Sequence, residues 1–555
     1  GTTRVGAAVP SNNSTVVILS DRTVTATANI ASTNLSIQID NGGVLDMSTY
    51  VFTNSLRSLS GQGVFSLASA SFPNVTTNNL INVGGGTVEY TTASDFSLPV
   101  ALTTYNNLSI NTVGSTAIQT HNITLSGDLI VKSGVFQIND NSSTTPLELV
   151  VNGNINVESR GSIRVGRGVT YTDIESVGTG GTAPFTNYYA GFHRVVLYGN
   201  FTNNGSVRFT NQDYPVYNSF PSTTQNENSG AASVFFMGAT NNLVTLNGQT
   251  DFYNFIVNKG SDQTYTLTVY SSAYSNFRLF GANSLASEGT TGTSNQRKAL
   301  WIRTGTLILD GMLIIPSLTE GTTQNSEFVI PSTASLQING ADVAVFVTAD
   351  SYREVVLAYG LTSPYANTNT RLGVNQNRRS GLNVFGTLTV NNGILSTKES
   401  SGIFANNNTG QIIFNDGIVD TKQFLYSSGT AMYEQTGGIL YVRGRFKRTP
   451  ASFSNILDLF DFQASHSLDH ARVANGVNAS YASFNIEGAS NIFNMTGGTI
   501  IIYDAVTTGT ANTYEVNSTA GNYNVTGGMV SYFPMTGTDL DDATAFTMYS
   551  VPPIG

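Results

Sequence analysis

The stretch Thr436–Val442 reads Thr-Gly-Gly-Ile-Leu-Tyr-Val, and close copies of it begin at Thr496 and Thr526. The copies start 60 and 30 residues apart, and each follows a short segment led by an aromatic residue. The repeated unit is therefore an aromatic strand, a glycine corner and an apolar strand. A glycine pair permits the positive φ that a tight corner between short strands requires. Repeats built in this way predict a solenoid.

The same corner occurs in looser form along the whole chain. Gly393, Gly417 and Gly438 are 24 and 21 residues apart, about one coil of a three-sided parallel β-helix. Alternating apolar and polar residues, typical of strands, flank the corners, and Ser454–Phe462 is the best candidate for a short helix. We therefore predict an all-β fold, a right-handed parallel β-helix (β-solenoid) with loop insertions. The predicted structural corners are Gly43, Gly86, Gly134, Gly305, Gly393, Gly438, Gly498 and Gly528.

Three regions of the chain differ in regularity. Residues 1–165 are predicted to form N-terminal β-solenoid coils, residues 166–340 β-solenoid with long loop insertions, and residues 341–555 regular C-terminal coils. Polar stretches interrupt the coils, and a solenoid accommodates such stretches as loops on one face. These insertions are predicted at 170–189, 211–230, 271–299, 352–380 and 449–477.

Composition excludes several classes of function. Charged residues make up 11% and hydrophobic residues 40% of the chain, which is poor for helices and suits strands joined by polar turns. The net charge of −10 argues against nucleic acid or an anionic membrane as the main partner. Because the chain has no cysteine, it forms no disulfide, thiolate metal site or cysteine nucleophile. No run of 18 apolar residues occurs, so we expect no transmembrane segment.

A family resemblance rests on one module near the N-terminus. Its segments are Gly86–Tyr90 (Gly-Thr-Val-Glu-Tyr), Tyr105–Ile110 (Tyr-Asn-Asn-Leu-Ser-Ile), Gly127–Val131 (Gly-Asp-Leu-Ile-Val) and Ser133–Ile138 (Ser-Gly-Val-Phe-Gln-Ile). The module resembles the repeats of very large secreted surface proteins of Bacteroidota, which are exported by type IX secretion and include gliding-motility adhesin-like proteins. The resemblance is best over 35–140, weaker over 231–315 and diffuse over 381–533.

This resemblance implies an extracellular, cell-surface location. It also implies a C-terminal sorting domain, which is not visible in this sequence. The chain begins at Gly1 without a leader and ends in a Pro-Pro segment, so we expect a mature or excised piece of a longer protein.

No metal or cofactor is expected. His466 and His470 are spaced for one helix face, but they lack the glutamate of a zinc protease and are expected in a solvated loop. The acidic clusters at 539–542 and 458–469 do not follow a calcium-loop spacing and are expected to be solvated turns. No phosphate loop, dinucleotide fingerprint or nucleophile elbow occurs.

A parallel β-helix also brings polysaccharide lyases and hydrolases into consideration. Such enzymes need carboxylates, or a carboxylate and an arginine, clustered in one groove. Asp342, Asp350, Arg353 and Glu354 are the closest such group, and an exposed salt-linked turn explains the last three equally well. We therefore expect no catalytic residues and a protein that is not an enzyme, with a carbohydrate-active β-helix enzyme as the alternative.

The predicted function is that of a surface protein, an adhesin or structural rod that displays loops to glycans or to cell-surface or outer-membrane proteins. A structural subunit of an outer-membrane-associated assembly is a second alternative. Aromatic residues in strands are expected to stack in the core, whereas those in insertions can form a binding surface. The basic cluster 443–448 is either a solvated edge or a docking patch. The predicted binding residues are Tyr188, Tyr189, Tyr214, Tyr217, Phe220, Arg443 and Arg445.

Overall fold

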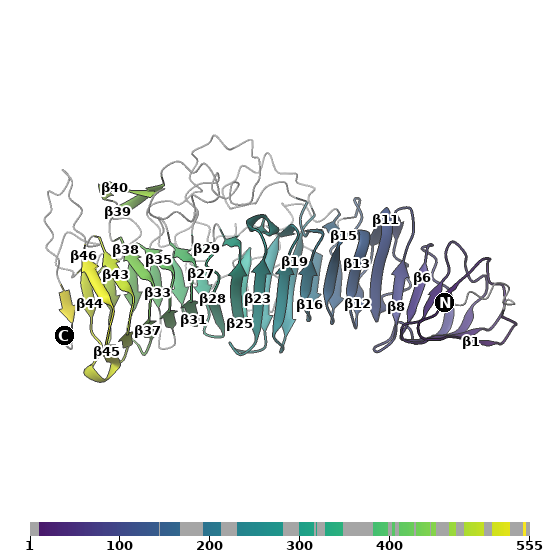
Figure 1. Ribbon diagram of the computed structural model, residues 1–555, viewed down its shortest axis with the longest axis horizontal. Coiled ribbons are helices and arrows are strands. Elements are labelled where there is room, and N and C mark those ends of the chain that lie inside the picture. The colour runs from purple at the N-terminus through teal and green to yellow at the C-terminus, as the bar shows by residue number, and fades with distance from the viewer. Residues whose placement is uncertain are drawn as a thin grey trace.

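The computed structural model is an elongated rod in which β-strands stack along the long axis (Figure 1). Successive coils pair in parallel, which confirms the predicted all-β parallel solenoid. Among the described residues, no helix is long and apolar enough to cross a membrane. The structure describes residues 10–550 apart from 144, 167–192, 212–229, 281–298, 316–317, 319–327, 348–380, 398–401, 406–409, 427–428, 444–445, 451–465, 473–481, 504–512 and 533–547.

One parallel ladder, face 1, continues through the described coils from β2 to β45. Each strand pairs with the strand one coil before it and the strand one coil after it. Its strands are β2 (Thr23–Thr25), β4 (Val44–Asp46), β6 (Val64–Leu67), β8 (Thr87–Tyr90), β11 (Asn107–Gln119), β13 (Leu129–Ile138), β15 (Ile155–Val165), β17 (Phe201–Asn203), β20 (Asn242–Leu246), β23 (Thr266–Ser271), β25 (Leu300–Gly311), β28 (Ala334–Ile338), β31 (Thr387–Val390), β34 (Gln411–Phe414), β37 (Met432–Gln435), β42 (Ile492–Met495) and β45 (Tyr523–Val525).

Face 2 follows face 1 within each coil. The second halves of β11, β13 and β15 belong to it, and β24 contacts β26 where one sheet gives way to the next. Its other strands are β9 (Phe96–Ser97), β18 (Ser206–Arg208), β21 (Thr250–Phe252), β24 (Phe277–Leu279), β26 (Leu313–Ile315), β29 (Val343–Phe346), β32 (Ile394–Ser396), β35 (Ile418–Thr421), β38 (Ile439–Val442), β43 (Thr499–Ile502) and β46 (Met529–Tyr532).

Face 3 completes the coil and leads back to face 1. The first half of β25 belongs to it, because β25 pairs with both β22 and β23. Its other strands are β10 (Thr104–Tyr105), β12 (Ile123–Leu125), β14 (Glu148–Val151), β16 (His193–Leu197), β19 (Ala232–Gly238), β22 (Asn254–Lys259), β27 (Phe328–Ile330), β30 (Leu382–Val384), β33 (Ile403–Ala405), β36 (Phe424–Tyr426), β41 (Phe484–Ile486), β44 (Tyr514–Val516) and β47 (Met548–Ser550).

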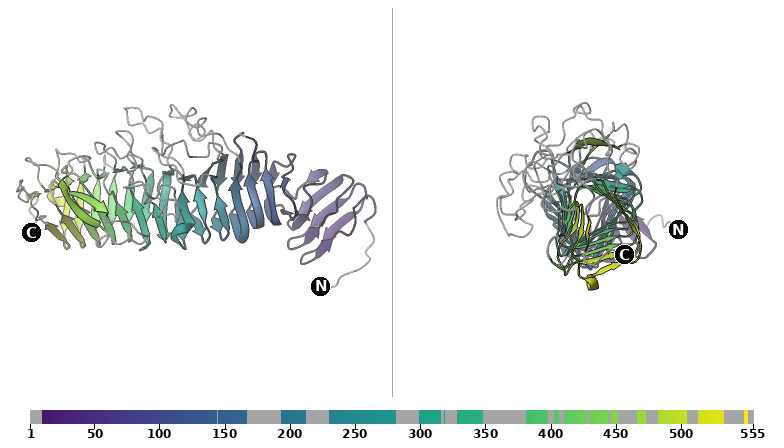
Figure 2. Two further views of the ribbon diagram at one scale, coloured as in Figure 1. Left: turned by 90° about the horizontal axis from the view of Figure 1, so that it is seen from above. Right: turned by 90° about the vertical axis from the view of Figure 1, so that its left-hand side faces the viewer.

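Three elements lie outside this plan. The N-terminal coils pair β1 (Thr15–Ile18), β3 (Ser36–Ile39), β5 (Leu56–Gly61) and β7 (Val75–Asn78) in a separate sheet, and they lie at an angle to the rest of the rod (Figure 2). The antiparallel pair β39 (Phe446–Pro450) and β40 (His466–Arg472) follows β38. The expectation of a loop at His466 and His470 was therefore wrong, because this segment pairs as β40. The short helices are η2 (Tyr274–Asn276) and η4 (Ala520–Asn522), and the helix predicted at 454–462 lies outside the described residues.

The core occupies the inside of the coils along the rod. One cluster of buried apolar side chains extends from Ile18 to Val516, because alternate residues of each strand point inward. Aromatic rings stack from coil to coil: Tyr433 lies 5.4 Å from Phe493, which lies 5.5 Å from Tyr523. The aromatic residues that precede the Thr-Gly-Gly corners are thus a core ladder, as the sequence predicts.

The two glycines of each corner have different roles. Only the second has a positive φ, for example 77° at Gly498. A Cβ on the first, Gly497, would lie 2.1 Å from the carbonyl oxygen of Thr436 in the coil below, so the space holds no side chain. The same contact explains Gly43 and Gly86, which have no positive φ and whose Cβ would lie 2.9 and 2.3 Å from a backbone oxygen. Close stacking of coils, as well as backbone conformation, requires glycine here.

A ladder of Asn and Asp side chains stabilises the corner between faces 3 and 1. The Oδ1 of Asn107 accepts a hydrogen bond from the backbone N–H of Asp128, and Asp128 accepts one from Asn154 in the same way. Asn154 accepts from Asn200, and Asn200 accepts from the N–H of Leu243. These bonds satisfy the backbone amides of Asp128, Asn154 and Asn200, which precede face 1 strands, and of Leu243 at the start of β20. Their sequence signature is Gly-Asp-Leu, Gly-Asn-Ile and Gly-Asn-Phe, at 127, 153 and 199.

Candidate functional site

The corner between faces 2 and 3 is the insertion edge of the rod. The described chain leaves this corner after β15, β18, β24, β29, β43 and β46 and returns at the start of the next face 3 strand. Because parallel strands of one ladder end at the same edge, the intervening segments all begin and end along one side of the rod. The longest of them are 167–192, 212–229, 281–298 and 348–380.

The insertion predicted at 271–299 begins later than the sequence indicates. Its first ten residues include η2 and β24, which fill the face 2 position of that coil. The undescribed part is 281–298. A face 2 strand of only three residues has too little periodicity to be recognised in a polar stretch.

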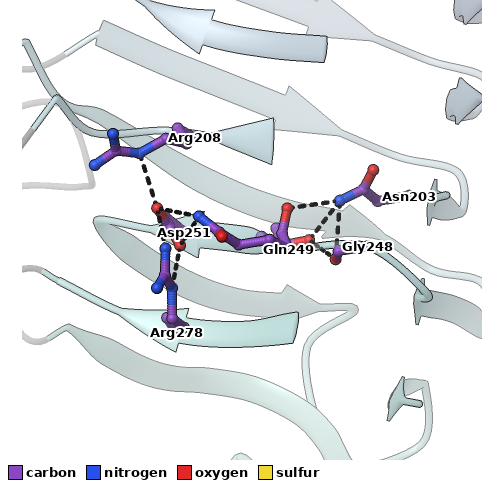
Figure 3. A network of polar contacts seen from close by, with 7 residues as sticks. Asn203, Arg208, Gly248, Gln249, Asp251 and Arg278 are labelled. Atoms are coloured by element: carbon purple, nitrogen blue, oxygen red, sulfur yellow. Dashed lines mark hydrogen bonds and ion pairs between the residues drawn. The ribbon is translucent and has the colours of Figure 1, made fainter. Parts of the chain in front are cut away.

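A buried charged triad lies on face 2 beside this edge (Figure 3). Arg208, Asp251 and Arg278 are in register on β18, β21 and β24, and they point away from the core that Phe252 enters. The Nε of Arg278 lies 2.5 Å from Oδ1 of Asp251 and its Nη2 lies 2.8 Å from Oδ2, a bidentate pair. The Nε of Arg208 lies 2.9 Å from Oδ2, and Gln249 donates a further hydrogen bond. Asp251 is completely buried, so this carboxylate is committed to the two arginines.

A second buried pair repeats this chemistry further along face 2. Asp420 on β35 accepts hydrogen bonds from the Nε of Arg443, at 2.8 Å, and from the hydroxyl of Ser396, at 2.9 Å. Arg443 is only 1% exposed, so it lies neither on a solvated edge nor in an open docking patch. On the same outer side, Tyr441 stacks against Tyr503 at 6.1 Å. Burial, together with Tyr441 and Asp420, raises the pKa of Tyr503 to about 12.

An apolar cluster covers the other side of the insertion edge. It lies on the outside of face 3, apart from the core, and its buried members are Val196, Ala231, Phe235, Tyr253, Ile256 and Phe280. Two arginine side chains stack on rings at the border of this cluster. The Cζ of Arg194 lies 5.1 Å from the ring centroid of Phe235, and the Cζ of Arg278 lies 5.4 Å from that of Phe280. Outward-facing side chains on both sides of the edge are therefore shielded from water, which is unusual for the outside of a solenoid.

Lys259 is a buried amine that the sequence pattern does not reveal. The residue is 1% exposed, and its Nζ donates to the carbonyl oxygen of Met237, at 2.5 Å, and to Oδ1 of Asn242. No carboxylate in the described part of the chain lies within ion-pair distance of it. Burial lowers the pKa of Lys259 to about 8. Both contacts are to the turn of the preceding coil, so the amine fastens two coils together.

Of the predicted binding residues, Arg443 is the one that falls in the described part of the chain. Tyr188, Tyr189, Tyr214, Tyr217, Phe220 and Arg445 lie outside the described residues. The same holds for Asp350, Arg353 and Glu354 of the possible catalytic group. Asp342 is described, and burial followed by this carboxylate raises the pKa of Tyr274 to about 12. Among the described residues, no group of three or more His, Cys, Asp or Glu side chains is arranged to hold a metal ion.

Sequence reasoning missed the triad for a specific reason. Val207-Arg208-Phe209 and Phe277-Arg278-Leu279 each place a charge between apolar residues, which signals an outward charge on a strand. The partner carboxylate is 43 residues from one arginine and 27 from the other. Because segments of different length separate the coils, sequence spacing does not show that the three positions share a register.

In comparisons with known proteins, no family model, no curated protein and no solved structure matches this chain. Its function is therefore inferred from its own residues.

Proposed function

We propose that the protein is a non-enzymatic extracellular surface protein of the adhesin type. A stiff rod carries inserted segments along one edge and displays them to glycans or to proteins of a cell surface. The observation that carries the proposal is the insertion edge, because segments from many coils begin and end on one side of a continuous core. Loops on a rigid scaffold are the usual location of binding groups.

The chemistry beside the edge supports this proposal. The carboxylates of Asp251 and Asp420 are each held by arginine, so neither is available as a general acid or base. Such ion pairs resist separation when they are buried, and they hold strands from which inserted segments depart. The resemblance to secreted Bacteroidota surface proteins supports an extracellular location and export by type IX secretion.

The test is to remove inserted segments without disturbing the rod. Residues 212–229 and 281–298 are replaced, separately and together, by short Gly-Ser linkers in the full chain. Binding of each variant to intact bacterial cells and to immobilised glycans is compared with the unchanged protein. We expect binding to fall while the fluorescence of Trp301, the one tryptophan of the chain, still reports a folded coil.

A matched control changes a different corner. Val113 is 86% exposed within β11, between faces 1 and 2, and Val113→Ser should leave binding unchanged. Folded linker variants that bind as well as the unchanged protein would refute the proposal. Release of unsaturated or newly reducing sugars from polysaccharides would instead establish the enzyme alternative. Stable recovery with outer-membrane proteins, without glycan binding, would favour a subunit of an assembly.

A further inference from the structure

Face 1 carries an exposed aromatic side chain that lies against the next coil. Tyr270 on β23 points outward and is 41% exposed, and with Tyr198 it is one of two aromatic residues in the described chain that are exposed to this extent. The ring lies against the backbone of the next coil: a Cβ on Gly311 would be 3.0 Å from Cε2 and 3.1 Å from Cδ2 of the ring. Glycine at this position leaves room for the ring to lie against the coil, and the exposed part of the side chain remains accessible to solvent.

Register places a mixed set of side chains around this ring. Tyr270 is in register with Thr245 in the coil before and with Asp310 in the coil after. Two residues earlier on the same three strands, Leu243, Thr268 and Ile308 are also in register and also point outward. Leu243 is 44% exposed, and the others are half-buried. The patch therefore combines one aromatic platform, two aliphatic side chains, two hydroxyls and one carboxylate.

Most polar groups of the patch have no hydrogen-bond partner within the described part of the chain. The hydroxyls of Thr245, Thr268 and Tyr270 make no hydrogen bond to other described residues, and Asp310 accepts one from the adjacent N–H of Gly311. No lysine or arginine in the described chain pairs with Asp310. An unpaired carboxylate without a nearby cation disfavours anionic ligands, and it accepts strong hydrogen bonds from hydroxyl groups.

We propose that Tyr270, Asp310, Thr245 and Thr268 form a subsite for a neutral sugar unit of a linear glycan. The C–H face of a pyranose ring stacks on Tyr270, and its hydroxyls bond to Asp310 and to the threonines. Strands of face 1 are about 4.8 Å apart, comparable to the length of one sugar unit, so a chain can run along the rod axis. The subsite rests on the proposed function and adds a ligand class and a place for it, outside the insertion edge.

The site is shallow, so single-site binding is weak, on the order of millimolar Kd. Affinity electrophoresis of the full chain in gels containing neutral polysaccharides (glucomannan, xyloglucan, galactan) detects binding of this strength, and alginate serves as the acidic comparison. We expect retardation by at least one neutral polysaccharide and none by alginate. Tyr270→Ala should weaken this binding at least about tenfold, and Asp310→Asn several-fold.

Two variants separate stacking from general surface effects. Tyr270→Phe keeps the ring and should retain most of the binding. Tyr198→Ala removes the other exposed aromatic residue, at 37% exposure, and should leave binding unchanged. Equal binding by Tyr270→Ala, an equal loss in Tyr198→Ala, or no retardation by any neutral polysaccharide would overturn the subsite. Capture of a protein through Tyr270, without glycan retention, would also overturn it. If cell binding still depends on the inserted segments in those cases, the proposed function stands without this subsite.

Discussion

Replacing Asp251 by Asn tests whether the buried triad holds the coils beside the insertion edge. Asn keeps the size of the side chain, but it removes the negative charge between Arg208 and Arg278 and directs an amide N–H₂ toward one of them. Asp251 is 0% exposed and Arg278 is 8% exposed, so water cannot replace the lost carboxylate. Arg208 is 37% exposed and can turn toward solvent.

These exposures decide the size of the effect. Breaking a buried ion pair by removing one partner costs about 3–5 kcal/mol, because a charge is left behind in a poorly solvated place. The half-exposed pair with Arg208 adds about 1 kcal/mol or less. We therefore expect Asp251→Asn to lower the free energy of unfolding of these coils by about 3–5 kcal/mol, a large part of the stability of an ordinary domain.

Trp301 provides a local assay, since it lies in β25, which follows the triad strands directly. Its guanidinium neighbour, Arg303, lies 4.9 Å above the ring, so unfolding of this coil changes the fluorescence. Urea titration of the full chain, followed at this tryptophan, gives the change in unfolding free energy. Because a solenoid unfolds in neighbouring units, the local signal reports these coils.

The matched control is Glu148→Gln, which removes the exposed partner of Arg194 at 3.0 Å. Glu148 and Arg194 are 36% and 27% exposed, so this change should cost less than about 1 kcal/mol. The argument from burial is refuted if Asp251→Asn costs no more than Glu148→Gln.

Three further substitutions test the stacking of the coils. Gly497→Ala should lower the free energy of unfolding by about 2 kcal/mol or more in urea titration, since its Cβ would lie 2.1 Å from a backbone oxygen. The control is Gly521→Ala, whose Cβ would have no atom within 4 Å, and it should change stability by less than about 0.5 kcal/mol. Asn200→Ala should cost about 1 kcal/mol and speed hydrogen exchange at the amide of Leu243, and unchanged exchange would contradict the ladder. Lys259 has a folded-state pKa of about 8 against 10.5 when unfolded, so the unfolded chain binds more protons between these values. Stability should therefore rise, by up to about 3 kcal/mol, from pH 8 to 10.5, and this rise should vanish in Lys259→Met; equal pH profiles would show that the amine is solvated.

Features that depend on contiguous residues could be predicted from the sequence, whereas features that depend on contacts between distant residues could not. The Thr-Gly-Gly corners and the aromatic residues before them identify the coil, because a corner and its two strands are contiguous. His466 and His470 were assigned to a loop, because β40 pairs with β39 across an intervening segment and such pairing leaves no local pattern. The function and location implied by the resemblance remain predictions.

The candidate sites show the same limit. Arg443 belongs to a basic run that indicates a surface, yet it is buried and forms an ion pair with Asp420, 23 residues away. Tyr270 looks like any alternating strand residue, and its partner Gly311 lies in the next coil. Neither pairing can be read from the order of residues.

The sequence by itself determined that the chain forms parallel coils, because strand alternation and corner glycines are local properties of the backbone and side chains. Only the tertiary structure decided which charged side chains became buried and which aromatic side chain stayed exposed. Asp251 meets two arginines, and Tyr270 lies on Gly311, because stacking brings residues 27 to 43 positions apart into register. That register depends on the lengths of the segments between coils, which no local pattern encodes.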